Sequence, residues 1–562
     1  MNLPNFPNLS VSKWPECLSG KWLFGLLVIF VSACSSPIQK EKADLIVHNA
    51  VVYTVDSTFS ITESFAIKDG KIIAVGKNDS ILAKYDGQKL DAQGKAIFPG
   101  LIDAHCHFDS YGLGLQKVDL VDTKSFDEVM HRVVEFSKST RTEWVAGRGW
   151  DQNDWNIKEF PDKEKLDSLF PTTPVFLSRI DGHAALVNAE GLKRANVTEK
   201  TKINGGIVEL KNGKLTGILI DNAIDLVASK IPTAGKPETR AALLLAQKNC
   251  FAVGLTTVDE AGLDKQTIDL MDEMQKNGEL KMRVYAMLTD NKENLDYYLE
   301  HGHYKTERLN VRSFKFYADG ALGSRGACLL QPYSDKQEQQ GFLLNTKEYY
   351  AEMAQKMMEK DFQMCTHCIG DSAHRFLLDT YGHALGGKND YRWRIEHAQV
   401  INPADFEKYT KYSVIPSVQS THATSDMYWA EKRLGPERVK GAYAYKDALN
   451  AAGVIALGTD FPVENINPLH TFYASVARKD LKGFPDRGFQ MENALTREET
   501  LKGMTIWAAY SNFEEKEKGS IEPGKFADFV ILDKDIMKIN IDEVPNVKVI
   551  YTFVNGEKVY LK

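Results

Sequence analysis

Short apolar segments rich in β-branched residues alternate with helical segments through the middle of the chain. This alternation is typical of βα units around a parallel sheet. The predicted strands lie near residues 96–105, 144–148, 174–178, 255–259, 282–287, 314–318, 363–367, 392–397, 413–418 and 454–459. A (β/α)8 TIM-like barrel needs eight strands, and the surplus pair lies before "GLTTVDEAG". We therefore expect an α/β barrel over residues 98–505, with an insertion at about 110–235 after its first strand.

β-rich sequence flanks the predicted barrel on both sides. Residues 44–97 hold alternating apolar residues around a D-G turn. Residues 506–562 include "VKVIYTFVNGEKVYL", which an N-G turn divides into a hairpin. We expect the two flanking segments to fold together into one small β-sandwich.

The first 43 residues carry the pattern of an export signal. "KWLFGLLVIFVSAC" joins a lysine to an apolar run shorter than the roughly 20 residues that span a bilayer. Its end resembles the bacterial lipobox, in which cleavage precedes a cysteine that is then lipidated, here Cys34. The pattern predicts a signal peptide over 1–33, a tether over 34–43 and an exported lipoprotein of the bacterial cell envelope, bound to the membrane by its lipid alone. A cleaved soluble protein and a buried helix are the alternatives, and the long stretch before Lys21 departs from the usual signal.

Charge and cysteine content restrict the partners. Lys and Arg number 69 against 76 Asp and Glu, a net charge of −7, so we expect no nucleic-acid partner. The cysteines downstream of Cys34 form no paired framework. Cys365 and Cys368 flank His367, and buried thiols explain them better than redox chemistry does. The sequence is compatible with a homo-oligomer.

Metal-ligating residue types stand at the ends of the predicted barrel strands. "FPGLIDAHCHF" puts His105 and His107 two positions apart, which places them on one face of a strand. Later strands end in Lys315, His367, His397 and Asp460. Because the carboxyl ends of barrel strands meet at one mouth, these side chains should converge. Four imidazoles, a carboxylate and a lysine suit a pair of divalent ions, and zinc accepts both imidazole and carboxylate ligands.

Nine motifs in order give the chain a family resemblance over roughly residues 44–560. They are "FPGLIDAHCHF", "RGWDQNDW", "DGHAALVN", "FKFYADGALGSR", "THCIGD", "RIEHAQ", "THATSDM", "GTDFPVE" and "GSIEPGKFADFVILD". Together they resemble the amidohydrolase superfamily, specifically amidohydrolase family 3, and are similar to the N-substituted formamide deformylases.

The resemblance implies a pair of metal ions and a modified lysine. Lys315 would be carboxylated on its amine, and the carbamate oxygens would bridge the ions. His105, His107 and Asp460 would hold one ion, and His367 and His397 the other. The implied activity is metal-dependent hydrolysis of a linear, non-peptide C–N amide bond in an N-acyl or N-formyl small molecule by a metal-activated hydroxide. Asp460 would carry the proton from water to the departing nitrogen.

Weaker signals suggest contacts with the substrate. The candidates are His183, His422, Arg325, Trp150 and Asp151. For His422 and His183 a structural role is the alternative, and for Trp150 it is packing. Asp319 and Asp371 are expected to cap helices. Cys106 and Glu396 are expected to point away from the neighbouring ligands, as packing or support.

Two other functions remain compatible with this sequence. The same ligand set could hydrolyse a cyclic amide or an ester, or could deaminate an imine. A non-catalytic lipoprotein that retains metal and presents a small molecule for uptake is the alternative from another class, although a binder has no need of the acid–base carboxylate Asp460.

Overall fold

The structure is a computed structural model that describes residues 39–562 apart from 140–142, 153–154, 180–183, 204–205, 222, 233 and 324. The predicted signal peptide, Cys34 and His183 lie outside the described residues. Within the described ranges, no helix is both long and apolar enough to cross a bilayer.

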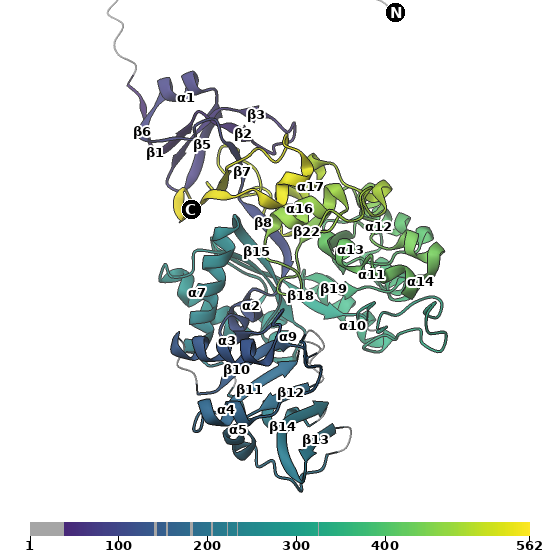
Figure 1. Ribbon diagram of the computed structural model, residues 1–562. Helices are drawn as coiled ribbons and strands as arrows, with labels where there is room; N and C mark the ends of the chain where they lie inside the picture. Colours follow the sequence, from purple (N-terminus) through teal and green to yellow (C-terminus); the bar gives the residue numbers. More distant parts are fainter. Residues whose placement is uncertain are drawn as a thin grey trace, which may run out of the picture. The chain divides into compact units, whose positions relative to one another are not determined.

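Eight parallel strands form a nearly closed barrel, which confirms the predicted fold class (Figure 1). They are β8 (Leu101–Cys106), β15 (Leu255–Leu263), β16 (Arg283–Thr289), β18 (Leu309–Tyr317), β19 (Gln363–Cys368), β20 (Arg394–His397), β21 (Ile415–Gln419) and β22 (Ala456–Gly458). Short β17 (Tyr304–Lys305) pairs with β18 outside this series. The segment that follows β22 is hydrogen-bonded to the end of β8, from Asp460 N to His105 O at 2.7 Å and from His107 N to Phe461 O at 2.8 Å. These bonds connect the last barrel strand to the first.

Amphipathic helices follow the barrel strands. On α8, for example, Ile268, Met271 and Met274 recur every three residues and are buried. The helices are α2 (Phe108–Gly114), α7 (Lys236–Ala252), α8 (Lys265–Lys276), α9 (Lys292–His301), α10 (Lys347–Glu359), α11 (Asp371–Leu385), α12 (Phe406–Tyr412), α13 (Ser420–Asp426), α14 (Ala430–Arg438), α15 (Tyr445–Ala452), α16 (Pro468–Ala477), α17 (Arg497–Gly503) and α18 (Ile506–Ser511). Short 3-10 helices occupy Pro403–Asp405, Val439–Gly441, Met491–Asn493 and Ile541–Asn546.

The two β-rich segments share one sandwich, as the sequence predicts (Figure 1). One sheet contains β1 (Glu41–His48), β4 (Ser64–Lys68), β5 (Lys71–Gly76) and β6 (Tyr85–Asp91), with α1 (Asn78–Lys84) between the last two. The other contains β2 (Val51–Tyr53), β3 (Ile61–Thr62), β7 (Ala96–Pro99), β23 (Phe529–Leu532), β24 (Val549–Val554) and β25 (Glu557–Leu561). A buried ion pair, Arg283 Nε to Asp528 Oδ2 at 2.6 Å, joins the sandwich to barrel strand β16.

The segment expected as a single strand over 96–105 is two strands in different sheets. β7 pairs with β2 and β23 of the sandwich, whereas β8 starts the barrel. Gly100 lies between them, and a Cβ there would be 2.2 Å from Thr256 Oγ1. A residue without a side chain is therefore needed where the chain leaves one sheet for the other.

The expected start of the second sandwich segment at residue 506 differs from the structure. α18 begins there, and its Ala508 and Ala509 pack against Ala104 and Ala456 of the barrel. The first sandwich strand of this segment, β23, begins at Phe529.

The insertion after the first barrel strand is a small α/β unit with a six-stranded mixed sheet. Its strands are β9 (Val118–Asp119), β10 (Val145–Trp150), β11 (Val175–Arg179), β12 (Ala184–Val187), β13 (Gly206–Lys211) and β14 (Lys214–Asp221). Its helices are α3 (Phe126–Ser139), α4 (Glu164–Leu169), α5 (Ala189–Arg194) and α6 (Asp225–Ala228). The two strands expected near 144–148 and 174–178 correspond to β10 and β11.

Candidate active site

His105 stands at the end of β8 and faces the barrel interior. It is fully buried, and its Nδ1 lies 2.5 Å from Glu396 Oε2. A carboxylate at that distance can only accept, so Nδ1 carries the proton and Nε2 is the free lone-pair donor. Burial, with Lys315 nearby, lowers the pKa of His105 to about 4, which keeps the imidazole neutral as a ligand must be.

His397 closes β20 on the opposite side of the site. Its ring centroid lies 4.9 Å from that of His105 and 4.5 Å from that of His367. Gln419 Oε1 is 2.7 Å from His397 Nδ1, which leaves Nε2 to face the site. His397 and Ala398 both have positive φ, 70° and 42°, a conformation that costs free energy and tends to occur at functional sites.

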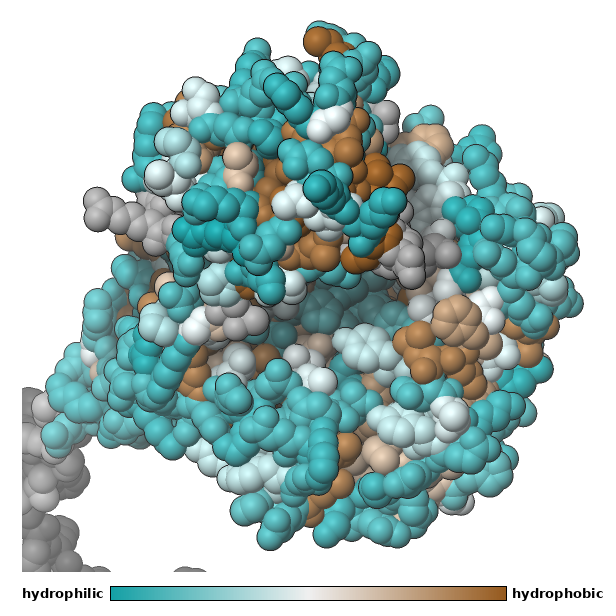
Figure 2. All heavy atoms as spheres, turned by 90° about the horizontal axis from the view of Figure 1, so that it is seen from below, coloured by the Kyte–Doolittle hydropathy of each residue, from teal (hydrophilic) through white to brown (hydrophobic). Residues whose placement is uncertain are grey.

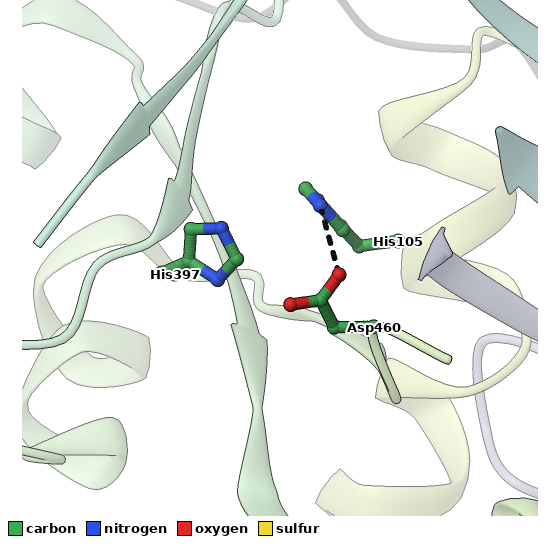
Figure 3. A group of neighbouring side chains, drawn as sticks. All are labelled: His105, His397 and Asp460. Carbon is green, nitrogen blue, oxygen red and sulfur yellow. Dashed lines mark ion pairs between the residues drawn. The ribbon is translucent and has the colours of Figure 1, made fainter. Parts of the chain in front are cut away.

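Asp460 follows β22 and approaches the imidazoles. Its Oδ1 lies 3.1 Å from His107 Nε2 and 3.7 Å from His105 Nε2. Figure 3 shows Asp460 and His105 directed toward one another, with the His397 ring beside them. Burial alone would raise the pKa of Asp460, but His107 and the other imidazoles outweigh it and hold the pKa well below its usual range. The carboxylate is therefore ionised.

Lys315 and His367 come from the neighbouring strands β18 and β19. Lys315 is 1% exposed, and its Nζ lies 3.2 Å from His105 Nε2. Within the described residues no ion pair joins Lys315 to a carboxylate, and burial lowers its pKa. Burial also lowers the pKa of His367 to about 3.

The donor atoms fit divalent cations. One ligand atom each of His105, His397 and Asp460 lies within 4.8 Å of the other two. In the described part of the chain, the buried atoms His367 Nε2 and His422 Nε2 have no hydrogen-bond partner. Buried polar atoms left without partners are costly, so their convergence on one place indicates that a ligand completes them.

Of the residues predicted to contact the substrate, some lie at the candidate site and others do not. His422, on α13, has its Nε2 3.8 Å from Asp460 Oδ2 and its ring stacked on His397. Trp150 is 1% exposed, and its indole donates to Leu177 O inside the insertion core, so it packs there rather than meeting a substrate.

The guanidinium of Arg325 donates to Asp335 at 3.1 and 2.8 Å, so it is already paired with a carboxylate. Asp151 pairs with Arg179 at 2.6 Å. His183 is outside the described residues, and its predicted role stays a prediction.

Sequence reasoning offered Glu396 as packing or support, but it put the side chain on the wrong face and missed Arg394. Glu396 does not point away from the predicted ligands: it is fully buried, and its carboxylate accepts from His105 Nδ1 at 2.5 Å. Arg394, two residues earlier on the same face, donates to Glu396 Oε1 at 2.7 Å and to Asp259 Oδ2 at 2.9 Å. The sequence did carry a signal for this pair: Arg394 and Glu396 are two positions apart on a strand that ends in the predicted ligand His397, so they share one face.

Asp319, which was expected to cap a helix, has another role. It accepts hydrogen bonds from the backbone N–H of Cys328, Ile369 and Gly370 at 2.8, 2.9 and 2.8 Å. Its Oδ1 also lies 3.9 Å from His367 Nε2. Asp319 therefore ties the loop after β18 to the end of β19, next to a predicted ligand.

An eight-stranded parallel barrel with these donors at the carboxyl ends of its strands defines a metal-dependent hydrolase. The chain belongs to the Amidohydrolase family, whose model matches residues 88–560. This confirms both the resemblance and the enzyme class drawn from the motifs.

Known relatives cover nearly the whole chain. It is 32% identical over 538 residues to "Protein LONG AFTER FAR-RED 3" of Arabidopsis thaliana, covering 92% of each chain. It is 25% identical over 540 residues to the N-substituted formamide deformylase of Arthrobacter pascens, covering 92% of this chain and 98% of that one. Among solved structures, an uncharacterized metal-dependent hydrolase of Pyrococcus horikoshii matches with a TM-score of 0.75 and 27% identity, covering 88% of this chain and 99% of that one.

Proposed function

We propose that this enzyme hydrolyses linear amide C–N bonds in N-acyl or N-formyl small molecules. The observation that carries the proposal is the convergence of Asp460, an ionised carboxylate, with the buried imidazoles of His105 and His397 at one barrel mouth. Similarity to a formamide deformylase supports the choice of a linear amide.

Two divalent ions, which we take to be zinc, would be held by the converging donors. His105, His107 and Asp460 would hold one, His367 and His397 the other, and carboxylated Lys315 both. Such ions acidify water and polarise a carbonyl when bound. The fit of the donor set supports this proposal, because its unpartnered atoms belong to zinc-ligating residue types.

The chain's own residues would move the proton. Water adds to the amide carbonyl carbon, and Asp460 takes the proton released. Asp460 then returns a proton to the nitrogen as the C–N bond breaks, giving a carboxylic acid and an amine. Amines leave poorly unless they are protonated, so both transfers matter. His422, whose Nε2 lies 3.8 Å from Asp460 Oδ2, would contact the substrate beside this path.

We expect the zinc-loaded enzyme to release amine from N-alkylformamides and N-acylamines in a fluorescamine assay. Lactams, alkyl esters and adenine serve as the comparison panel, and their products are measured by liquid chromatography, because an ester releases an alcohol and adenine releases ammonia. The value of kcat/KM for linear amides should exceed the values for lactams, alkyl esters and adenine by at least about tenfold. Preference for an ester, a lactam or adenine would replace the proposal with the corresponding hydrolase or deaminase. No turnover across the panel would favour the binding protein.

We also propose that Cys34 is lipidated and tethers the enzyme to a membrane of the bacterial envelope. The support is the lipobox-like "VSAC" and the stretch "SSPIQK" that follows it. The predicted tether over 34–43 is too long, because β1 of the sandwich begins at Glu41. In cells fed an alkyne fatty acid, the wild type should be labelled and should pellet with membranes. Cys34→Ala should lose both the label and the membrane fraction, whereas Cys250→Ala, at a buried cysteine of the barrel unit, should keep both. Membrane retention of an unlabelled Cys34→Ala protein would contradict the anchor.

A further inference from the structure

Tyr317 is an aromatic residue at the barrel mouth that takes no part in the proton transfers of Asp460. It is the last residue of β18, two positions after Lys315, so both side chains face the barrel axis. Its ring centroid lies 4.8 Å from Lys315 Nζ and 5.6 Å from the His367 ring. In the sheet register Tyr317 stands directly opposite His367. The ring therefore borders two of the predicted ligands.

The phenol oxygen reaches the ends of strands that supply no predicted ligand. A Cβ built on Gly262, on β15, would lie 3.9 Å from Tyr317 Oη and 3.7 Å from Thr289 Oγ1. Thr289 is the last residue of β16. The predicted ligands come from β8, β18, β19 and β20, from the residue directly after β8 and from the second residue after β22. The ends of β15 and β16 thus form a ligand-free part of the mouth, and glycine keeps the space beside the phenol open.

The phenol is available to a bound molecule. Tyr317 is 40% exposed. Among the described residues, no hydrogen bond engages its hydroxyl, whereas the buried Tyr350 hydroxyl donates to the Tyr317 carbonyl at 2.7 Å. In the view from below, Figure 2 shows a hollow in the surface with hydrophilic and hydrophobic residues along its edges.

We propose that Tyr317 is a further catalytic residue, whose hydroxyl donates a hydrogen bond to the substrate carbonyl oxygen in the part of the mouth formed by β15, β16 and β18. The inference rests on the proposed function, because that reaction places negative charge on the same oxygen. A donor already aimed at this charge stabilises it without reorganisation. Tyr317 itself forms no covalent bond and returns no proton.

Tyr317→Phe keeps the ring and removes only the donor. With N-butylformamide as substrate we expect kcat to fall on the order of a hundredfold while KM stays within about threefold, the pattern of a lost transition-state donor. Tyr297→Phe is the matched control, because Tyr297 lies on α9 with a similar exposure of 38% and should keep wild-type kinetics. Circular dichroism and thermal unfolding check that both variants fold.

A binding measurement separates this inference from the proposed function. Methylphosphonate, whose tetrahedral oxygens imitate the attacked carbonyl, is titrated calorimetrically into the zinc-loaded wild type and Tyr317→Phe. We expect at least about tenfold weaker binding by the variant. If the wild type hydrolyses no amide but the variant loses affinity, the inference stands and the linear-amide proposal falls. If kcat and affinity are unchanged in Tyr317→Phe, or the wild type does not bind methylphosphonate, the inference is overturned.

Discussion

Replacing Asp460 by asparagine should lower kcat by on the order of 10⁴-fold, the upper range for loss of a general acid–base. The amide keeps an oxygen near His107 and His105 but cannot accept or return a proton. Asp460 is 6% exposed and ionised in the native fold, so its carboxylate is available as the proton acceptor. Steady-state kinetics on zinc-loaded protein, with metal content measured on the same sample, tests this.

Asp405→Asn is the matched control. Asp405 is also buried, at 2% exposure, but it pairs with Arg375 at 2.9 Å and Lys408 at 3.1 Å. Its neutralisation should lower the unfolding temperature and leave kcat within about threefold, because a carboxylate outside the site carries no proton in the reaction. If Asp460→Asn retained activity within tenfold of wild type at full metal content, another group would have to carry the proton.

The barrel and the meeting of the candidate ligands at its mouth were predictable because they depend on one periodic rule. Alternation of strands and helices places every strand end at one mouth, so His105, Lys315, His367 and His397 could be assigned together. The support residues were harder. His397 has φ of 70°, which breaks the two-residue alternation of the strand, and this is why Glu396 and His397 both face the site.

Long-range packing decided the features that the sequence left open. The apolar stretch over 96–105 looks continuous, and only the partners of each half show that it enters two sheets. Trp150 lies in a motif of the family, yet the insertion core buries its ring and binds its indole N–H. Arg325 pairs with Asp335 because of a loop fold that no local pattern predicts.

Replacing Lys315 by alanine should abolish most activity and remove one of two zinc equivalents. Among the described residues no carboxylate forms an ion pair with the buried Lys315 amine, so this amine is unfavourable as a cation. A neutral amine can react with carbon dioxide to form an anionic carbamate. That anion would supply oxygen ligands among the imidazoles. Formate or acetate should restore part of the activity by entering the space that the side chain leaves. Elemental analysis and kinetics with and without added carboxylate measure both effects.

Lys518→Ala provides the comparison with a buried lysine that has an ordinary partner. Its ammonium pairs with Glu514 at 2.5 Å, so removing it should lower the stability of the fold. The variant should keep two zinc equivalents, and added acetate should not change its activity. In wild type grown with ¹³C-bicarbonate, a carbamate carbon resonance should appear, persist in Lys518→Ala and vanish in Lys315→Ala. Full activity and two zinc equivalents in unsupplemented Lys315→Ala would refute the carbamate. Alanine supplies no oxygen ligand, so the two ions would then be held without a carbamate at this position.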